Sequence, residues 1–287
     1  MKRPRISAFV IAYNRAAILG TCLRALTFAD ELIVIDKSST DASRRIAETC
    51  ADKVVTVPWT PTVEETRTLA ASLCRHEWIL FMDDDECLSP AAGVRIRAEL
   101  LHPTAEIYEF PLRHYILGQH DERAYYWPEH HVRLFRRGAV TFSPTVHAGI
   151  VRHSDRVGRF AADGDVCIHH LSHQDTFCWI EKTNRYTARP DRSGMQPGPE
   201  GLAAFAHQRI DHWLERTGDK TPNTYPEAVA VLRAIYDMVD AVKSWETERG
   251  LDGATLFAQA CQALDSARTA APYPDAPAPT EPVKPVE

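Results

Sequence analysis

Strand-like and helix-like segments alternate four times within the first hundred residues. The strand-like runs are apolar and short enough for a buried sheet: "RISAFVIAY", "ELIVID", "KVVTV" and "WILFM". The segments after them carry apolar residues at helical spacing: "AAILGTCLRAL", "SSTDASRRIAETC", "TVEETRTLAASLC" and "SPAAGVRIRAELL". A strand and a helix repeated in this way indicate an α/β fold with a mostly parallel, doubly wound sheet.

The pattern changes after Pro103. The segments "EIYEFPLRHYIL" and "HHVRLFRRGAVTF" predict two strands of an antiparallel extension, with "GQHDER" as the turn between them. Residues 190–200 have the Pro and Gly content of a linker, and three helical segments follow. We therefore predict an α/β domain at 1–190, a helical C-terminal region at 191–271 and a Pro-rich disordered tail at 272–287.

Composition narrows the class of protein. A net charge of −6 gives no support for a nucleic-acid surface, which needs clustered Lys and Arg. The seven cysteines are scattered and form no CxxC pair, which argues against a disulfide framework and favours a reducing compartment. The first apolar stretch reads as a strand and not as a signal peptide, and no stretch approaches the roughly 20 apolar residues of a membrane span. We expect a cytoplasmic protein that can contact a membrane peripherally.

Four consecutive acids follow the fourth strand, in "ILFMDDDE" at residues 79–86. In open parallel sheets, ligands bind beyond the carboxyl ends of the strands, so these acids should lie at the ligand edge. Asp83 and Asp85, one residue apart, can share a hard cation such as Mg²⁺ or Mn²⁺ that also binds the diphosphate of a substrate. The alternative is that an acid caps the next helix, which would account for only one of the four.

An ordered set of motifs resembles family 2 glycosyltransferases of the GT-A (Rossmann-like) fold. The early blocks are "VIAYN", "IDKSSTDAS", "EETRTLAA" and "WILFMDDDE". The later blocks "VRLFRRG", "TVHAGI", "CIHHLSH" and "EKTNRYTA" resemble the bacterial branch that builds lipopolysaccharide core. The resemblance implies inverting transfer from a nucleotide-diphosphate sugar, with UDP as the expected nucleotide, to a glycan or glycolipid. It also implies Mg²⁺ or Mn²⁺ as cofactor and peripheral contact with the inner membrane.

The resemblance also assigns side chains to the donor site. Its donor-binding residues are Ala12, Tyr13, Asn14, Asp36, Arg67, Asp83 and Asp84. Its metal ligands are Asp83 and Asp85 of the DXD motif together with His169. Each position also has a structural alternative: Tyr13 as a packing residue, Asp36 as a helix cap and Arg67 as a solvated helix residue.

An inverting transfer needs a base that deprotonates the acceptor hydroxyl. Glu129, in "YYWPEHHVRLF", is the first candidate because aromatic residues beside it could stack on a sugar ring. His147 is the second candidate, and His130 and Asp163 follow. The structural alternative for Glu129 is a surface acid beside two histidines.

Several histidines and cations lie further along the chain. His169, His170 and His173 form the pattern H-H-x-x-H, which lacks a convincing fourth ligand for structural zinc. Three cations follow at near-helical spacing, and they could hold a diphosphate or an anionic lipid or form a solvated face: Lys182, Arg185 and Arg189.

Two positions depart from the family pattern. Lys37 stands where many members have a second acid, and Ala148 stands where the lipopolysaccharide branch commonly has one after its histidine. The second departure leaves the acceptor-side base open, so a non-catalytic nucleotide-sugar or glycan-binding module is one rival. An Asp-based phosphatase is another, although Cys87 occupies the place of the Thr or Val it would need.

Overall fold

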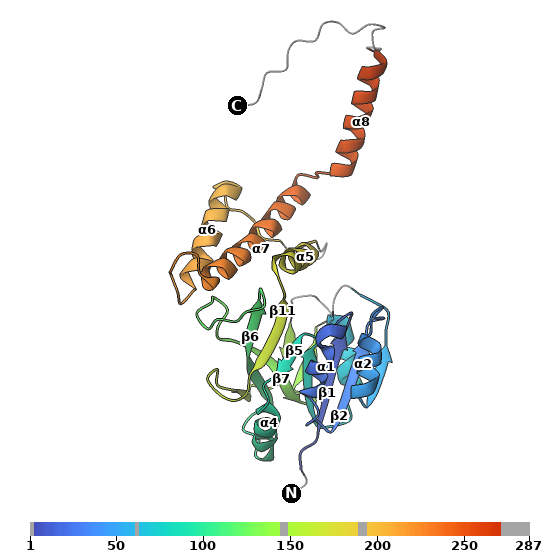
Figure 1. Cartoon of the computed structure of the whole chain (residues 1–287), viewed down its shortest axis with the longest axis vertical. Coiled ribbons are helices and arrows are strands. Elements are labelled where there is room, and N and C mark those ends of the chain that lie inside the picture. The colour runs from blue at the N-terminus through green and yellow to red at the C-terminus, as the bar shows by residue number, and fades with distance from the viewer. Residues whose placement is uncertain (1–2, 61–62, 144–148, 189–193, 271–287) are drawn as a thin grey trace.

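The computed structural model describes residues 3–60, 63–143, 149–188 and 194–270. Its first part contains the predicted strand–helix units (Figure 1). The strands are β1 (Ile6–Ala12), β2 (Glu31–Asp36), β3 (Lys53–Thr56) and β4 (Trp78–Asp83), and the helices are α1 (Ala16–Arg24), α2 (Ser43–Cys50), α3 (Glu64–Leu73) and α4 (Ala92–Leu101). β1 pairs in parallel with both β2 and β4, and β3 pairs in parallel with β2. The predicted α/β class with a mostly parallel sheet is confirmed.

Further strands, some parallel and some antiparallel to their neighbours, extend this sheet. They include β5 (Glu86–Leu88), β6 (Ile107–Ile116), β7 (Glu129–Arg136), β10 (Val157–Arg159) and β11 (Ile168–His173). Among the described residues the strand order is β3-β2-β1-β4-β7-β6-β11-β5, with β10 beside β6. β7 is antiparallel to β4 and to β6, and β11 runs parallel to β6 but antiparallel to β5. β5, the short strand that begins at the last of the four acids, is therefore paired with β11, the strand that carries the histidines.

Two details of the predicted extension are wrong. The segment expected as one strand is split into β7 and β8 (Val140–Phe142), and β8 pairs with β9 (Ile150–Arg152) in a separate two-stranded sheet. The break is a turn in which Ala139 donates its N–H to the Arg136 carbonyl at 2.8 Å, and Gly138 adopts φ 88°, a left-handed conformation that glycine accommodates. The connection between β6 and β7 spans 117–128, which is longer than the expected six-residue turn.

Side chains alternate across the sheet and fill a core on each face. Val10 and Met82 point to the face covered by α1, α2 and α4, where Leu23 and Ile96 are fully buried. Phe9 and Phe81 point to the opposite face, covered by α3 and β8, and their rings stack with centroids 5.7 Å apart. The strands at the centre of the sheet are buried on both faces, as their continuous apolar runs predict.

Four helices follow the sheet: α5 (Thr176–Thr187), α6 (Gly201–Glu215), α7 (Tyr225–Glu248) and α8 (Gly253–Ala270). α6 and α7 lie side by side beyond the end of β6, and α8 extends away from the rest of the protein (Figure 1). A third apolar cluster joins Val229 and Leu232 of α7 to Ile116, Tyr126 and Trp179. The predicted disordered tail, 272–287, lies outside the described residues.

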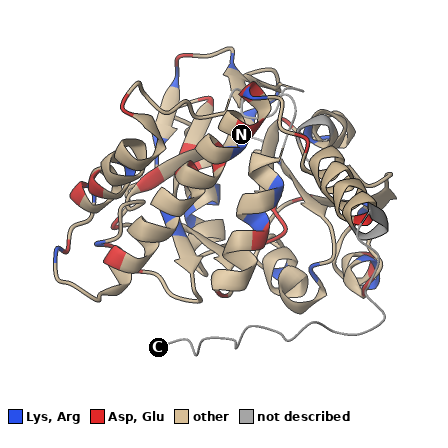
Figure 2. Cartoon of the chain, turned by 90° about the horizontal axis from the view of Figure 1, so that it is seen from above, with Lys and Arg blue, Asp and Glu red and all other residues tan. Residues whose placement is uncertain are grey.

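Charged residues of both signs are interspersed over the ribbons in Figure 2. None of the helices in the described ranges combines the length and the apolar character needed to cross a membrane.

Candidate functional site

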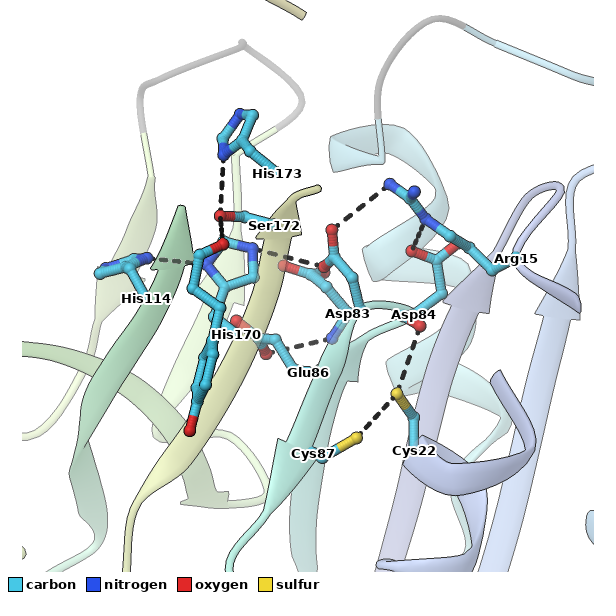
Figure 3. A network of polar contacts seen from close by, with 12 residues as sticks. Arg15, Cys22, Asp83, Asp84, Glu86, Cys87, His114, His170, Ser172 and His173 are labelled. Carbon is cyan, nitrogen blue, oxygen red and sulfur yellow. Dashed lines mark hydrogen bonds and ion pairs between the residues drawn. The ribbon is translucent and has the colours of Figure 1, made fainter. Parts of the chain in front are cut away.

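The four acids lie at the carboxyl ends of β1 and β4. The parallel register sets Ile11 beside Asp83, so the acids follow directly where the two central strands end. Asp85 and Glu86 are buried, whereas the side chain of Asp83 is 29% exposed. Figure 3 shows that Arg15 approaches this cluster from the β1 side and that His170 approaches it from β11.

Asp83 and Asp84 contact different parts of the edge. Asp83 accepts two hydrogen bonds from Arg67 of α3, at 2.9 and 3.2 Å, and Arg133 of β7 lies 3.8 Å away. Asp84 accepts a hydrogen bond from the backbone N–H of Tyr13 at 2.9 Å and another from Arg15 at 3.2 Å. Asp84 therefore ties the turn after β4 to the end of β1.

Asp85 is surrounded by three cationic or ionisable groups. Arg15 lies 3.3 Å from its carboxylate, and Lys182 of α5 and His170 of β11 each lie 3.4 Å away. Glu86, next in sequence, forms a buried ion pair with Arg133 at 2.5 Å. The acids are thus gathered with cations that come from four separate elements.

These surroundings separate the ionisation of the three aspartates. Burial opposes ionisation of Asp83, but Arg67 and Arg133 outweigh it and lower its pKa. Burial likewise opposes ionisation of Asp85, and His170, Lys182 and Arg15 outweigh it, so that its pKa is also lowered. Burial together with the charge of Asp85 raises the pKa of Asp84 to about 7. Asp83 and Asp85, the two alternate acids, are therefore the ones held as carboxylates at neutral pH.

A cavity of about 310 Å³ opens beside the acids, and we call it the donor cavity after the donor site that the sequence predicts there. It is lined by Ala12, Tyr13, Lys37, Trp59, the three aspartates, His170 and Lys182, among others. The ring of Tyr13 lies 5.9 Å from that of Trp59, which is 49% exposed. Such an aromatic pair at a strand end offers flat surfaces to a planar ligand.

Three of the predicted donor residues lie outside the lining of this cavity. Asn14 lines a neighbouring cavity, and its side-chain oxygen accepts a hydrogen bond from the N–H of Thr40 at 2.8 Å. Arg67 does not line the cavity itself but donates a hydrogen bond to Asp83, which does. Asp36 is 1% exposed, and its Oδ1 accepts a hydrogen bond from the Ser39 N–H at 3.2 Å. Its buried Oδ2 has no hydrogen-bond partner within the described part of the chain.

The histidine that approaches Asp85 is His170 and not the predicted His169. Successive residues of a strand point to opposite faces, so only one of the two can face the acids. His169 instead contacts the Tyr115 hydroxyl at 2.9 Å and Cys167 at 3.5 Å. His173 packs against Trp179, with ring centroids 4.5 Å apart. The three histidines therefore diverge, which removes the support for a zinc site built from them.

Glu129 begins β7 and lies in a hydrogen-bonded chain of side chains. Its carboxylate is 2.8 Å from His114 and 3.0 Å from His131. His114 in turn contacts His170 through their Nδ1 atoms at 2.9 Å. Burial opposes ionisation of Glu129, but the two histidine contacts outweigh it and lower its pKa. The carboxylate is thus positioned and ionised.

A second cavity of about 450 Å³ lies beside Glu129, and we call it the acceptor cavity because Glu129 is the predicted base for the acceptor hydroxyl. Its walls include Tyr125, Tyr126, Trp179 and Trp213. It shares His170, Ser172 and His173 with the donor cavity, so the two cavities meet at β11. Glu129 therefore lies on the wall of a space that opens towards the acids.

Two other predicted bases, His130 and Asp163, do not line either cavity. His130 contacts the Phe160 carbonyl at 3.1 Å, and Asp163 is exposed in a loop that lines neither cavity. His147 and Arg189 lie outside the described residues. Sequence reasoning missed Arg133 and Trp59, whose contacts depend on which elements become neighbours in space.

The donor atoms fit a hard divalent cation. Among the described residues, no group of three or more His, Cys, Asp or Glu side chains is spaced to hold a metal ion. Mg²⁺, however, is commonly held by one or two carboxylates together with substrate phosphate oxygens. Asp83 and Asp85 are ionised oxygen donors on the wall of one cavity, and this set meets that requirement.

Comparison with known proteins agrees with this geometry. Residues 7–149 match glycosyl transferase family 2. An "Uncharacterized glycosyltransferase" of Rickettsia bellii is 30% identical over 148 residues, which cover 50% of this chain and 50% of that protein. The lipopolysaccharide core biosynthesis glycosyltransferase LpsC of Rhizobium meliloti is 30% identical over 160 residues, covering 51% and 57% of the two chains.

A solved structure, S. aureus TarS 1-349 in complex with UDP, is 12% identical with a TM-score of 0.45, covering 87% of this chain and 93% of that one. The chain spans about half the length of the curated relatives it matches first. The matched residues 7–149 contain all four strand–helix units and the acid cluster, in a GT-A-like α/β fold. Through this segment, the chain belongs to glycosyl transferase family 2.

Proposed function

We propose that the protein is an inverting glycosyltransferase that moves a sugar from a UDP-sugar to a cell-envelope glycan or glycolipid such as lipopolysaccharide core. It would act in the cytoplasm, in peripheral contact with the inner membrane. The observation that carries this proposal is the meeting of two cavities, one lined by ionised strand-end aspartates and the other by Glu129 and aromatic rings. A transfer reaction needs such adjacent sites for its two substrates.

The donor would occupy the cavity at the strand ends. Its nucleotide base would lie against Tyr13 and Trp59, and its diphosphate would lie towards Arg15 and Lys182. Charge-assisted hydrogen bonds from such cations favour phosphate oxygens.

Asp83 and Asp85 would hold Mg²⁺ or Mn²⁺, and His170, in place of the His169 expected from the sequence, would lie beside Asp85 at 3.4 Å. The bound cation neutralises charge that develops on the departing diphosphate. Asp84 would act as a positioning residue, because its carboxylate accepts a hydrogen bond from the Tyr13 N–H and fixes the end of β1 beside the turn.

Glu129 would accept the proton of the acceptor hydroxyl. Its contacts with His114 and His131 hold the carboxylate in one orientation, and its lowered pKa keeps it ionised at neutral pH. The hydroxyl oxygen then attacks the sugar on the side opposite the diphosphate, which inverts the configuration at that carbon. A base positioned in this way typically contributes about 10²–10⁴-fold to the rate.

A binding and turnover experiment tests this function. We expect UDP to raise the melting temperature more with Mn²⁺ than without it, and at least one UDP-sugar to release UDP when a glycan extract is supplied. If neither UDP nor any UDP-sugar shifts the melting temperature with Mn²⁺, the donor site is wrong. Binding without UDP release or transfer would instead favour the non-catalytic binding module.

A further inference from the structure

Three arginines surround Trp213 on α6. The guanidinium carbons of Arg209, Arg216 and Arg233 lie 5.3, 5.5 and 5.0 Å from the centre of its ring. The indole N–H of Trp213 donates a hydrogen bond to Asp237 at 2.6 Å, which fixes the ring against α7. Stacking on a fixed ring restricts the guanidinium groups before any ligand arrives.

The charges around Trp213 do not balance. Asp237 is fully buried and forms ion pairs with Arg209 at 2.8 Å and with Arg233 at 3.6 Å. Arg216 is exposed and forms no ion pair within the described ranges. Arg216 and Arg233 line the acceptor cavity, whereas Arg209 does not. Asp237 thus pairs with two of the three guanidinium groups, and the third, that of Arg216, lies on the cavity side.

Tyrosine and tryptophan side chains form part of the remaining wall of the acceptor cavity. Tyr125 packs against Trp213 with ring centroids 4.9 Å apart, and both line the cavity. Trp179 lines it as well, and its buried indole N–H has no hydrogen-bond partner in the part of the chain that is described. Flat aromatic faces suit the apolar face of a sugar ring, and arginine suits a carboxylate or phosphate because it can donate two parallel hydrogen bonds.

We propose that the acceptor cavity selects an anionic sugar, one that carries a phosphate or a carboxylate. Arg216 and Arg233 hold the anionic group, and the rings of Tyr125 and Trp213 contact the sugar. Glu129, on the same wall, is held by His114 and His131. This inference rests on the proposed glycosyl transfer and adds the chemical class of the acceptor.

Arg209 provides the matched control. It stacks on the same ring as Arg216, but it forms the short ion pair with Asp237 and does not line the cavity. If the arginines only stabilise the packing of α6 on α7, replacing Arg209 should matter at least as much as replacing Arg216. If they recognise an anion, the Arg216 variant should be the affected one.

Titrations of three sugars, followed by tryptophan fluorescence, test the proposal. We expect the full chain to bind glucose 6-phosphate and glucuronic acid about 10-fold or more tightly than glucose, since hydrogen bonds to charged groups are the stronger class. Arg216→Gln should lower the affinity for both charged sugars about 10-fold and leave glucose binding unchanged. Arg209→Gln should preserve the preference.

Equal affinity for the three sugars, undetectable binding of the charged ones, or equal losses in the two variants would each overturn the inference. Inorganic phosphate that competes as well as glucose 6-phosphate would reveal an anion site without a sugar and would overturn it too. Binding of UDP with Mn²⁺ is measured on the same samples. If UDP binds and the preference is absent, only the acceptor inference fails, whereas loss of UDP binding contradicts the proposed function itself.

Discussion

The donor cavity and the acceptor cavity are built in different ways. The donor cavity draws its acids and Tyr13 from the ends of β1 and β4, two neighbouring parallel strands of the buried sheet. The acceptor cavity draws its walls from β6, the connection before β7, the strand β11 with α5, and the helices α6 and α7. The first site depends on the sheet, whereas the second depends on how helices from distant parts of the chain pack against it.

The two cavities also differ in how they hold their acids. Asp85 is buried among Arg15, Lys182 and His170, so its charge is balanced by groups from three elements. The Glu129 side chain is 46% exposed and is held by two histidines. Changes in the donor cavity should therefore act on binding of nucleotide and metal, and changes in the acceptor cavity should act on turnover.

The largest expected effect is loss of the donor site in Asp85→Ala. Removing this carboxylate takes away one of the two proposed oxygen ligands, so we expect Mn²⁺-dependent binding of UDP to disappear and transfer to fall at least about 100-fold. Calorimetric titration of UDP with and without Mn²⁺ measures the loss of Mn²⁺-dependent binding. Glu48→Ala, an exposed acid on α2, is the control and should bind normally. Wild-type Mn²⁺ dependence in Asp85→Ala would remove Asp85 from the metal site.

The next effect separates turnover from binding. Glu129→Gln keeps the shape of the side chain but not its basicity, so kcat should fall about 10²–10⁴-fold while UDP affinity stays unchanged. Steady-state kinetics alongside a UDP titration measures both quantities. His130→Gln, whose partner is a backbone carbonyl, is the control. Near-normal kcat in Glu129→Gln would transfer the role of base to His147.

A core substitution tests whether the acceptor cavity depends on helix packing. Leu232 is 8% exposed and joins α7 to β6 and α5. Leu232→Ala should destabilise the seating of α7 by about 2–5 kcal/mol and lower transfer, but UDP affinity should stay near wild type. Thermal unfolding measures the loss of stability, and titration with UDP measures the affinity of the donor cavity. Val242→Ala, on the same helix but 42% exposed, is the matched control. Equal losses of UDP binding and transfer in Leu232→Ala would show that the cavities are not independent.

The smallest effect concerns Asp36, which precedes Lys37 of the donor-cavity wall. Its buried Oδ2 has no partner among the described residues, so a hydrogen bond from the nucleotide would satisfy it. Asp36→Asn should raise the KM for a UDP-sugar about 10-fold and leave kcat within about twofold. The melting temperature of the variant provides the control for folding. An unchanged KM in a folded variant would make Asp36 a structural residue.

The sequence by itself determined the sheet and the place of the acids. Continuous apolar runs before Asn14 and Asp83 dictate strands buried on both faces, and parallel strands bring their carboxyl ends to one edge. The acid cluster therefore follows from patterns a few residues long. The same local patterns predicted the helices from 201 onwards, because apolar spacing is a property of each segment alone.

Only the tertiary structure decided which side chains meet at that edge. His169 and His170 are adjacent, and the sequence alone does not show which of them faces the acids. The pairing of β11 with β5 and β6 directs the side chain of His170 towards Asp85. Likewise, Arg216 and Arg233 became part of a cavity wall only when α6 and α7 packed beyond the end of β6. Contacts between distant segments depend on strand order and helix packing, which the periodicity of a single segment does not encode.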